Sequence, residues 1–465
     1  MRRCNNIVFY ALVAAIFLFM ISPSFLTKGM FLDGITYAAI SKNFANGYGS
    51  FLHPFYNGIW FVTYTPHPPM LFFFEGLFFK VLGTDFWVEK VFSVFCILIT
   101  MILMSKLCKK IGLQNGFMSW LFFISIPLII WAATNNLIEN CLMIFTTLSV
   151  LLYLHSLERN RFLLLIFAGL SLAIGFLLKG FVAFFPFSFP FIYWLVMKNN
   201  TFKRIMLDTF VMTFCAVLPI LVIIISSTDV KNYFINYYNF QIAGEMTNVK
   251  TVNTRYYILG RYFCELIPCF VICGLLLWKI KFKKEYKYNG KKALMLFLFS
   301  LTSVLPIVIT MKQSGFYFLP ALPFVSIAFA ALIDNRINRF YLKISTKQWF
   351  ASLKYISIIL FLTSIITCFV FYGSASRDKG MLSDIDIIAK TIGKNKIISI
   401  PDEMAQEYTL SAYCARFYNI SIDPNVQHHH QYLLVRKALD KERDNYHKLP
   451  LQMELFYLYK AKTNN

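Results

Sequence analysis

The chain has 465 residues, of which 58% are hydrophobic, 18% aromatic and only 15% charged. About a quarter of the residues of a soluble domain are charged, so this composition excludes an ordinary soluble protein. The formal net charge of +22 would suit a nucleic-acid partner, but the basic residues gather in short loops between apolar blocks. Lysine and arginine mark the cytoplasmic loops of membrane proteins and attract anionic lipids. We therefore expect a lipid bilayer, and no nucleic acid, as the partner of this charge.

Apolar blocks about as long as a bilayer-spanning helix recur along the chain. They predict an all-α polytopic membrane protein with about 11 transmembrane helices, within a range of about 10 to 13. The blocks lack the alternation of a transmembrane β-strand, which argues against a β-barrel. They cover residues 7–26, 92–104, 117–131, 137–154, 162–178, 210–225, 263–278, 294–310, 318–333 and 355–372.

The first block resembles a secretory signal peptide, because Arg2 and Arg3 precede an apolar core. That core is about 20 residues long, and no pair of small residues before Lys28 forms a clear cleavage site. We therefore expect an uncleaved first transmembrane helix.

Loops rich in lysine and arginine alternate with loops of low charge, and this alternation predicts the topology. The apolar stretch 70–82 lies on the outer side and is expected to be an interfacial or membrane-dipping helix. We expect the protein in the inner or plasma membrane, with its site facing the periplasm or exterior. The predicted cytoplasmic clusters are 106–110, 159–161, 198–204, 279–292 and 336–354, and the outer segments are 27–87, 132–136, 226–262, 312–317, position 180 and the tail after residue 373.

The composition changes after residue 373, where charged residues and short strand-type runs replace the long apolar blocks. We expect a transmembrane domain over residues 1–373 and a small soluble α/β domain on the outer face over residues 374–465, which is near the lower end of the usual domain size. The predicted elements are strands at 397–400, 418–422 and 432–435 and a helix at 402–414.

Three adjacent histidines, His428 to His430, lie just before the last of these strands. Adjacent histidines rarely converge on one metal ion without partners elsewhere in the chain, so we favour a polar loop over a metal site. The ten cysteines show no CxxC spacing, which supports neither a zinc site nor a disulfide framework. The sequence requires no cofactor and leaves a divalent metal ion open.

Asp33 is a lone carboxylate in the first outer segment. Ionisable groups at membrane depth are functional candidates by default, so Asp33 is a candidate catalytic base. It could instead cap a short helix that begins near Ile35, and the two roles are compatible. That helix carries Tyr37, Ile40 and Phe44 on one face, so we expect it to be amphipathic and to lie along the interface.

Glu139 and Lys179 are predicted at the outer ends of two spans. A buried glutamate needs a partner, so Glu139 is a second catalytic candidate, although an acid at a helix start also suits the helix dipole. The positive-inside rule places lysines on the other side of the membrane, and Lys179 is therefore a candidate for binding a phosphate. The alternative is that Lys179 only extends along the membrane edge to reach water.

Five further residues of the outer segments are candidates. His67 lies between prolines, which hold the backbone extended, and it is either a substrate contact or an ordinary loop residue. Arg255 and Lys312 could bind a phosphate, and Tyr256 and Tyr317 could contact a substrate. Arg255 could equally be a surface loop charge.

On this topology two acids, several cations and a histidine gather on one side of the membrane. Such a set suits a transferase that takes a sugar from a lipid phosphate, because a carboxylate can deprotonate the acceptor and cations can stabilise the departing phosphate. A transporter or lipid-linked sugar flippase would instead show ionisable groups at mid-span and repeated halves. A non-enzymatic assembly factor would leave the charged edge residues unexplained.

The motifs resemble those of the C-type integral-membrane glycosyltransferases, a group that includes the protein O-mannosyltransferases and the lipid A aminoarabinose transferase. The resemblance covers roughly residues 5–335. It rests on Asp33, His67-Pro-Pro69, Glu139-Asn140, Leu178-Lys179-Gly180 and Tyr317-Phe-Leu-Pro-Ala-Leu-Pro323, in this order.

The resemblance implies a polyprenyl-phosphate-linked sugar, such as an undecaprenyl-phosphate sugar, as donor. It also implies transfer on the outer face of the membrane to a lipid, glycan or protein acceptor, with Asp33 as the catalytic base. Three positions depart from the family pattern: Gly34 replaces a frequent glutamate, Glu139 a frequent aspartate, and Phe316 a frequent basic residue. These departures bear on the acceptor and the second acid more than on the reaction type.

Overall fold

The computed structural model describes residues 2–59, 62–244, 249–279, 289–344, 347–425, 427–441 and 445–462. The basic loop predicted at 279–292 therefore lies mostly outside the described residues. The chain forms two compact units. The first contains Met1–Pro23, Pro66–Pro68 and Ser93–Val370, and the second contains Ser24–Thr65, Pro69–Phe92 and Phe371–Asn465.

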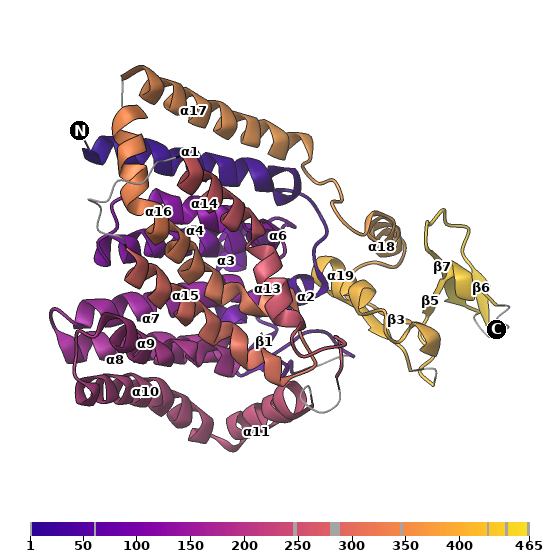
Figure 1. Ribbon diagram of the computed structural model, residues 1–465. Coiled ribbons are helices and arrows are strands. Elements are labelled where there is room, and N and C mark those ends of the chain that lie inside the picture. Colours follow the sequence, from indigo (N-terminus) through magenta and orange to yellow (C-terminus); the bar gives the residue numbers. More distant parts are fainter. Residues whose placement is uncertain are drawn as a thin grey trace. The chain divides into compact units, whose positions relative to one another are not determined.

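The described residues of the first unit are almost entirely helical (Figure 1). Two of its helices, α1 and α4, extend by a few residues into the second unit. The α-helices are α1 (Arg2–Phe25), α4 (Val88–Lys110), α5 (Phe117–Ser125), α6 (Pro127–Ala133), α7 (Ile138–Ser156), α8 (Arg161–Lys179), α9 (Phe189–Met197), α10 (Phe202–Ile225), α11 (Thr228–Tyr237), α13 (Tyr257–Glu265), α14 (Ile267–Lys279), α15 (Gly290–Val304), α16 (Leu322–Ile344) and α17 (Lys347–Val370). Short 3₁₀ or π turns occur at η1 (Gly180–Ser188), η2 (Tyr238–Ala243), η3 (Leu305–Ile309) and η4 (Gly315–Ala321).

Among the described residues, 8 helical segments are long and apolar enough to cross a membrane, or up to 9 if the bent pair α13 and α14 is one span. The predicted polytopic all-α class is confirmed, with fewer candidate spans than the expected number of about 11. The block at 117–131 divides into α5 and α6 because Ile126 has an extended backbone before Pro127, as a residue before proline prefers. The stretch 70–82 forms a helix of only 13 residues, about 20 Å long, whereas the hydrocarbon core is about 30 Å thick.

Helix α8 packs between α7 and α10 in the first unit. Gly169 allows the close approach to α10, because a Cβ atom there would lie 2.5 Å from the carbonyl oxygen of Met212. Lipid tails are as apolar as leucine, so helices associate in a membrane through such close backbone packing. At the other end of α8, Arg161 forms an ion pair of 2.6 Å with the buried Asp208 of α10, which fixes the alignment of the two helices.

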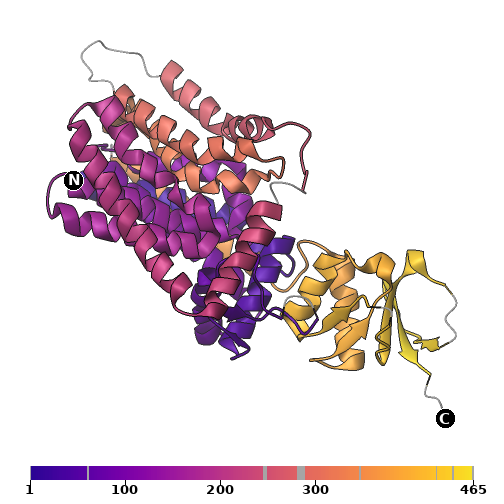
Figure 2. The same cartoon turned by 90° about the horizontal axis from the view of Figure 1, so that it is seen from below.

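The second unit combines helices with a small sheet. The five-stranded sheet has the order β4-β3-β5-β7-β6, with the first three strands parallel and the last two pairs antiparallel. Helices α18 and α19 lie on one face of this sheet (Figure 2). The elements are α2 (Leu32–Ala45), β1 (Gly49–Ser50), β2 (His53–Pro54), α3 (Met70–Leu82), α18 (Lys379–Ile392), β3 (Ile397–Ser399), η5 (Asp402–Met404), α19 (Tyr408–Tyr418), β4 (Ser421–Asp423), β5 (Tyr432–Arg436), η6 (Lys437–Leu439), β6 (Tyr446–Lys448) and β7 (Phe456–Ala461).

The predicted α/β character of the tail is confirmed, with some changes. The predicted strand at 418–422 begins at Ser421 instead, because α19 continues to Tyr418 and Asn419 then takes a left-handed conformation. The sequence reading also missed β6, β7 and the helix α18. Strand β7 pairs with both β5 and β6, so it completes a sheet that the sequence alone showed only in part.

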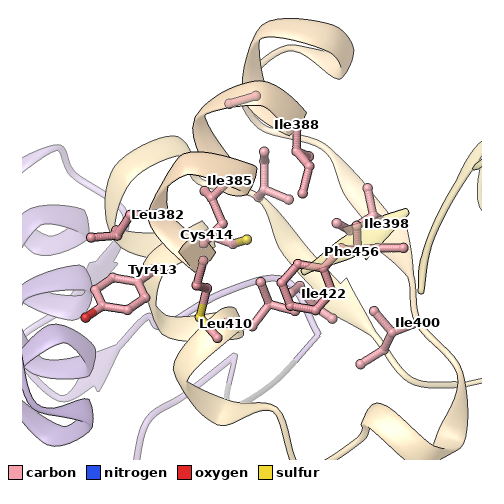
Figure 3. Packing of buried hydrophobic residues seen from close by; sticks show 14 of the residues in the cluster. Leu382, Ile385, Ile388, Ile398, Ile400, Leu410, Tyr413, Cys414, Ile422 and Phe456 are labelled. Atoms are coloured by element: carbon pink, nitrogen blue, oxygen red, sulfur yellow. The ribbon is translucent and has the colours of Figure 1, made fainter. Parts of the chain in front are cut away.

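The hydrophobic core of the second unit joins the tail to the segment that follows α1. Its centre contains Ile385, Ile398 and Phe456 (Figure 3), and Met30 and Ile35 belong to the same cluster. The Tyr413 hydroxyl also hydrogen-bonds to the Met30 carbonyl oxygen at 3.1 Å. The predicted division of the chain at residues 373 and 374 stays a prediction, and the compact units follow a different division.

Candidate active site

Glu139 and Lys179 form a buried ion pair in the first unit. Glu139 lies in the first turn of α7 and Lys179 is the last residue of α8. The two helices are antiparallel neighbours joined by a short turn, so the start of one meets the end of the other. Each charge also suits its helix dipole, which is positive at a start and negative at an end. The side chains are only 2% and 10% exposed, so each charge depends on the other for compensation.

Two aromatic rings from η4 border this ion pair. The Nζ atom of Lys179 lies 4.9 Å from the ring centroid of Tyr317 and 5.5 Å from that of Phe316. Phe316 stacks in turn on Trp131, with 6.2 Å between the ring centroids. Aromatic faces attract ammonium groups, so the rings hold the lysine without using its hydrogen-bond donors. Phe316, a departure from the family pattern, contributes directly to this arrangement.

The backbone conformation and the close packing after Lys179 require a glycine at position 180. Its φ angle of +72° is in the region that L-residues rarely adopt, and a Cβ atom there would lie 1.9 Å from the Tyr237 hydroxyl. The chain can therefore turn from α8 into η1 while it passes against α11. The turn fixes the end of α8 and with it the position of Lys179.

His67 lies near the same lysine. Its carbonyl oxygen accepts a hydrogen bond of 2.6 Å from the hydroxyl of Tyr233 on α11. Burial holds the pKa of the His67 imidazole well below its usual value, and the charges of Lys179 and Lys312 lower it further. His67 is therefore neutral at physiological pH, so the positive charge around it comes from the lysines.

Arg255, Tyr256 and Lys312 lie on two loops that Gln313 joins. The Gln313 side chain donates to the carbonyl oxygens of Arg255 at 2.7 Å and Thr310 at 2.9 Å, and it is 3% exposed. The side chains of Arg255 and Tyr256 are exposed, Tyr256 at 72%, whereas Lys312 is half-buried. The structure thus brings Lys312 near His67 and Lys179, and the roles of Arg255 and Tyr256 stay predictions.

Asp33 belongs to the second unit. It is half-buried in the first turn of α2, a helix that begins at Leu32 and has Phe31 at its N-cap position. The predicted helix start near Ile35 and the predicted capping role of Asp33 are therefore wrong, because the chain becomes helical before the carboxylate. The acid still lies at the positive end of the helix dipole. Its predicted meeting with Glu139 and Lys179 stays a prediction.

Helix α2 does not present the polar face expected of an interfacial helix. Its residues from Gly34 to Asn43 are buried except for Thr36, because α3 and α19 both pack against it. Even Ser41 is enclosed, and its hydroxyl donates a hydrogen bond of 2.7 Å to the buried Glu75 of α3. The carboxylate of Asp33 is thus carried by a helix that is fixed on several sides.

Comparisons with known proteins relate part of the sequence to a family model and the whole chain to a known fold. The family model "Dolichyl-phosphate-mannose-protein mannosyltransferase" matches residues 66–226, a segment that includes His67, Glu139 and Lys179. The structure is similar to that of ArnT from Cupriavidus metallidurans bound to undecaprenyl phosphate, with a TM-score of 0.68, 13% identity and coverage of 98% of both chains. The likeness to ArnT shows a shared fold, and the family model adds a sequence match over residues 66–226. The predicted resemblance is confirmed.

Other solved structures share this fold. ArnT in the apo state matches with a TM-score of 0.68 and 13% identity, over 96% of both chains. The Archaeoglobus fulgidus oligosaccharyltransferase in complex with Zn and sulfate matches with a TM-score of 0.50 and 11% identity, over 92% of this chain and 68% of that one. At these identities the likeness is one of fold. No curated protein matches the chain by sequence.

The sequence alone did not single out Arg261 and Glu265. They form an ion pair of 2.5 Å one helical turn apart on α13, and Glu265 also accepts a hydrogen bond of 3.0 Å from the backbone N–H of Leu128. The Arg261 side chain lies against Gly315, at the start of the turn that carries Phe316 and Tyr317. An arginine four residues before a glutamate, at the start of an apolar block, was the available signal.

The histidine run of the tail has a partner that the sequence did not reveal. His428 to His430 lie in a loop before β5, as predicted, but Asp423 at the end of β4 meets two of them. One atom from each of Asp423, His428 and His430 lies within 4.8 Å of the others. These three residues could hold a metal ion.

Proposed function

We propose that this chain transfers a sugar from a polyprenyl-phosphate carrier, such as undecaprenyl phosphate, to an acceptor on the outer face of the inner or plasma membrane. The buried Glu139–Lys179 pair carries the proposal. It holds an ammonium group beside aromatic rings at one end of the membrane helices, and the fold is shared with a protein whose structure contains undecaprenyl phosphate. An ammonium group in a dry site is a strong ligand for a phosphate.

The cations of the first unit are proposed to bind the donor phosphate. Lys179 contributes the buried ammonium group, and Lys312 and Arg255 add charge from the neighbouring outer loops. Glu139 was predicted as a catalytic acid. Its ion pair supports a positioning role, in which its carboxylate keeps Lys179 charged and oriented. His67, Tyr256 and Tyr317 are proposed to contact the sugar or the carrier.

Asp33 is proposed as the general base. Its carboxylate takes the proton of an acceptor hydroxyl or amine, and the acceptor atom forms a bond to the anomeric carbon of the sugar. The bond between that carbon and the phosphate oxygen breaks, and the electron pair leaves with the polyprenyl phosphate. Attack from the side opposite the phosphate inverts the anomeric carbon. The lysines stabilise the negative charge that develops on the phosphate in the transition state.

Metabolic labelling of cells that express Asp33→Asn tests the base. We expect one labelled outer-face product to disappear and the labelled sugar to accumulate on the carrier lipid, and the class of the lost product identifies the acceptor as lipid, glycan or protein. Asp229→Asn is the matched control, because Asp229 is an exposed acid at the start of α11. A full level of product in Asp33→Asn would remove Asp33 from this role.

A second assay separates transfer from transport. The purified chain in detergent is given labelled carrier lipid extracted from the accumulating cells, together with the acceptor fraction found above. A transferase makes the product in detergent, where there are no two sides of a membrane, and a flippase makes none. Absence of product from a folded wild-type chain would favour the flippase.

A further inference from the structure

We propose that Asp423, His428 and His430 form a binding site for a divalent ion of the zinc class at the edge of the C-terminal sheet. The site is independent of the proposed sugar transfer. It lies wholly within the second unit and uses residues that the proposed function leaves without a role.

The three side chains already converge on one point. The Oδ2 atom of Asp423 lies 2.9 Å from Nδ1 of His428 and 2.8 Å from Nε2 of His430. Ligand atoms around a tetrahedral zinc ion lie about 3.3 Å apart, since each bond is about 2.0–2.1 Å long. A small outward movement of the two rings would therefore admit the ion between them.

The other oxygen of Asp423 is held separately. Its Oδ1 atom accepts a hydrogen bond of 2.9 Å from the backbone N–H of Asn425, and the residue is only 1% exposed. Carboxylate ligands of metal ions are usually oriented by such outer hydrogen bonds. Asp423 thus presents one oxygen to the histidines, and the backbone fixes the direction of that oxygen.

The loop that carries the histidines is also fixed in advance. Strands β3, β4 and β5 are parallel, and β3 lies between the other two, so the loop from β4 to β5 must cross the end of β3. Ser399, the last residue of β3, donates a hydrogen bond of 3.0 Å to the His428 carbonyl oxygen. The Tyr446 hydroxyl donates another, of 3.0 Å, to the His430 carbonyl oxygen. Preorganised ligands reduce the loss of conformational entropy when an ion binds.

The ligand set indicates the class of ion. Two imidazole nitrogens and one carboxylate oxygen suit Zn²⁺ and similar divalent ions, whereas Mg²⁺ and Ca²⁺ prefer oxygen ligands throughout. Three protein ligands leave a fourth position for water. The His428 side chain is 58% exposed and that of His430 25%, so the fourth position would be open to solvent. A bound ion would fasten the β4–β5 loop to the sheet.

Zinc binding by the full chain tests the site. The chain is purified in detergent through a tag that contains no histidine, treated with a chelator, and titrated with Zn²⁺ by calorimetry. We expect one Zn²⁺ per chain in the wild type. His430→Ala and His428→Ala should weaken binding by more than about 100-fold, since even outer-shell changes cost 10–100-fold. An equal concentration of Mg²⁺ or Ca²⁺ should not compete.

His429→Ala is the matched control, because His429 belongs to the same exposed run and lies outside the converging group. It should bind Zn²⁺ as the wild type does. An equal loss in His429→Ala and His430→Ala would overturn the proposal, because it would show general attraction to a histidine run. So would the absence of stoichiometric binding, or unchanged binding in Asp423→Asn. Co²⁺ gives a second measurement, since its visible spectrum reports four-coordinate binding and should change in His428→Ala and not in His429→Ala.

Discussion

Lys179 in the first unit and Lys42 in the second are both buried lysines, and their ammonium groups have different kinds of partner. The Lys42 ammonium donates to the carbonyl oxygens of Ala415 at 3.0 Å and Arg416 at 2.7 Å, and to the side-chain oxygen of Asn419. These acceptors lie at the end of α19, where the helix dipole is negative. An ammonium group has three donors, so this lysine is saturated by the protein itself.

The Lys179 ammonium uses fewer of its N–H donors in hydrogen bonds than the Lys42 ammonium does. Among the described residues its ammonium hydrogen-bonds to the carboxylate of Glu139, and its other close partners are the ring faces of Phe316 and Tyr317. Ring faces attract the charge but leave N–H donors for other acceptors. The contrast separates two uses of a buried lysine: Lys42 closes the end of a helix, whereas Lys179 retains donors for a ligand. Substitution of Lys42 should therefore affect stability, and substitution of Lys179 should affect binding.

The largest effect is expected at Arg416, which neighbours Lys42 at the end of α19. Its guanidinium group binds both carboxylate oxygens of Glu89, at 3.2 and 2.7 Å, and the two side chains are 1% and 0% exposed. Arg416→Met leaves a buried carboxylate without its hydrogen-bonded ion-pair partner, so we expect a loss of about 3–5 kcal/mol in unfolding free energy. The midpoint of thermal unfolding in detergent measures it. The double variant Glu89→Gln with Arg416→Met should recover a large part, and a failure to recover would contradict the electrostatic explanation.

Removal of the charge at Lys179 should weaken donor binding rather than remove the fold. The double variant Lys179→Met with Glu139→Gln takes away both charges and so avoids a buried unpaired carboxylate. We expect affinity for undecaprenyl phosphate to fall about 10–100-fold, since a hydrogen bond to a charged group contributes about 1.5–3 kcal/mol. Calorimetric titration with this lipid measures it.

Lys42→Met is the control for that experiment. It removes an equally buried ammonium group that the protein already saturates, so affinity for undecaprenyl phosphate should not change. An unchanged affinity in the Lys179 and Glu139 double variant would end the distinction between the two lysines and would remove Lys179 from the donor site.

The parts of this protein that the sequence could predict depend on local properties. The length and apolarity of a segment decide whether it can span a membrane, so the polytopic all-α class could be predicted, as could the place of Glu139 and Lys179 near helix ends. Their pairing could also have been inferred, because Glu139 lies in the first turn and Lys179 at the end of a single helical hairpin made of α7 and α8. The polar loop before β5 could also be predicted from its composition.

The remaining features depend on contacts between distant parts of the chain. Tyr413 and Met30 are separated by 383 residues, and no periodicity in either segment indicates that they share a core. Asp423 and His430 are close in sequence, but they converge only because the loop from β4 crosses the end of β3. The helix start at Leu32 was missed for another reason, since Phe31 offers no capping side chain to mark it.

Gly180 tests whether the position of Lys179 depends on the end of α8. Gly180→Ala places a methyl group against the Tyr237 hydroxyl and keeps a positive φ, so we expect a loss of more than about 1 kcal/mol in unfolding free energy. The affinity for undecaprenyl phosphate should fall together with stability. Thermal unfolding and lipid titration measure the two effects. Gly180→Ala with Tyr237→Phe should recover part of the stability, because it removes the hydroxyl, and equal stability of the single and double variants would contradict the steric explanation.

The last prediction concerns the pH dependence of Lys42. Burial, together with the nearby charge of Arg416, lowers the pKa of its ammonium group from 10.5 to about 7. Between these values the unfolded chain binds more protons than the folded chain, so stability rises with pH, by up to about 1.4 kcal/mol per pH unit. Below pH 7 both states are protonated and the dependence ends. Thermal unfolding of the wild type and of Lys42→Met is measured from pH 6 to pH 9. The stability of the wild type relative to that of Lys42→Met should increase above pH 7. A constant difference would show that the three oxygen acceptors keep Lys42 charged, which would strengthen its contrast with Lys179.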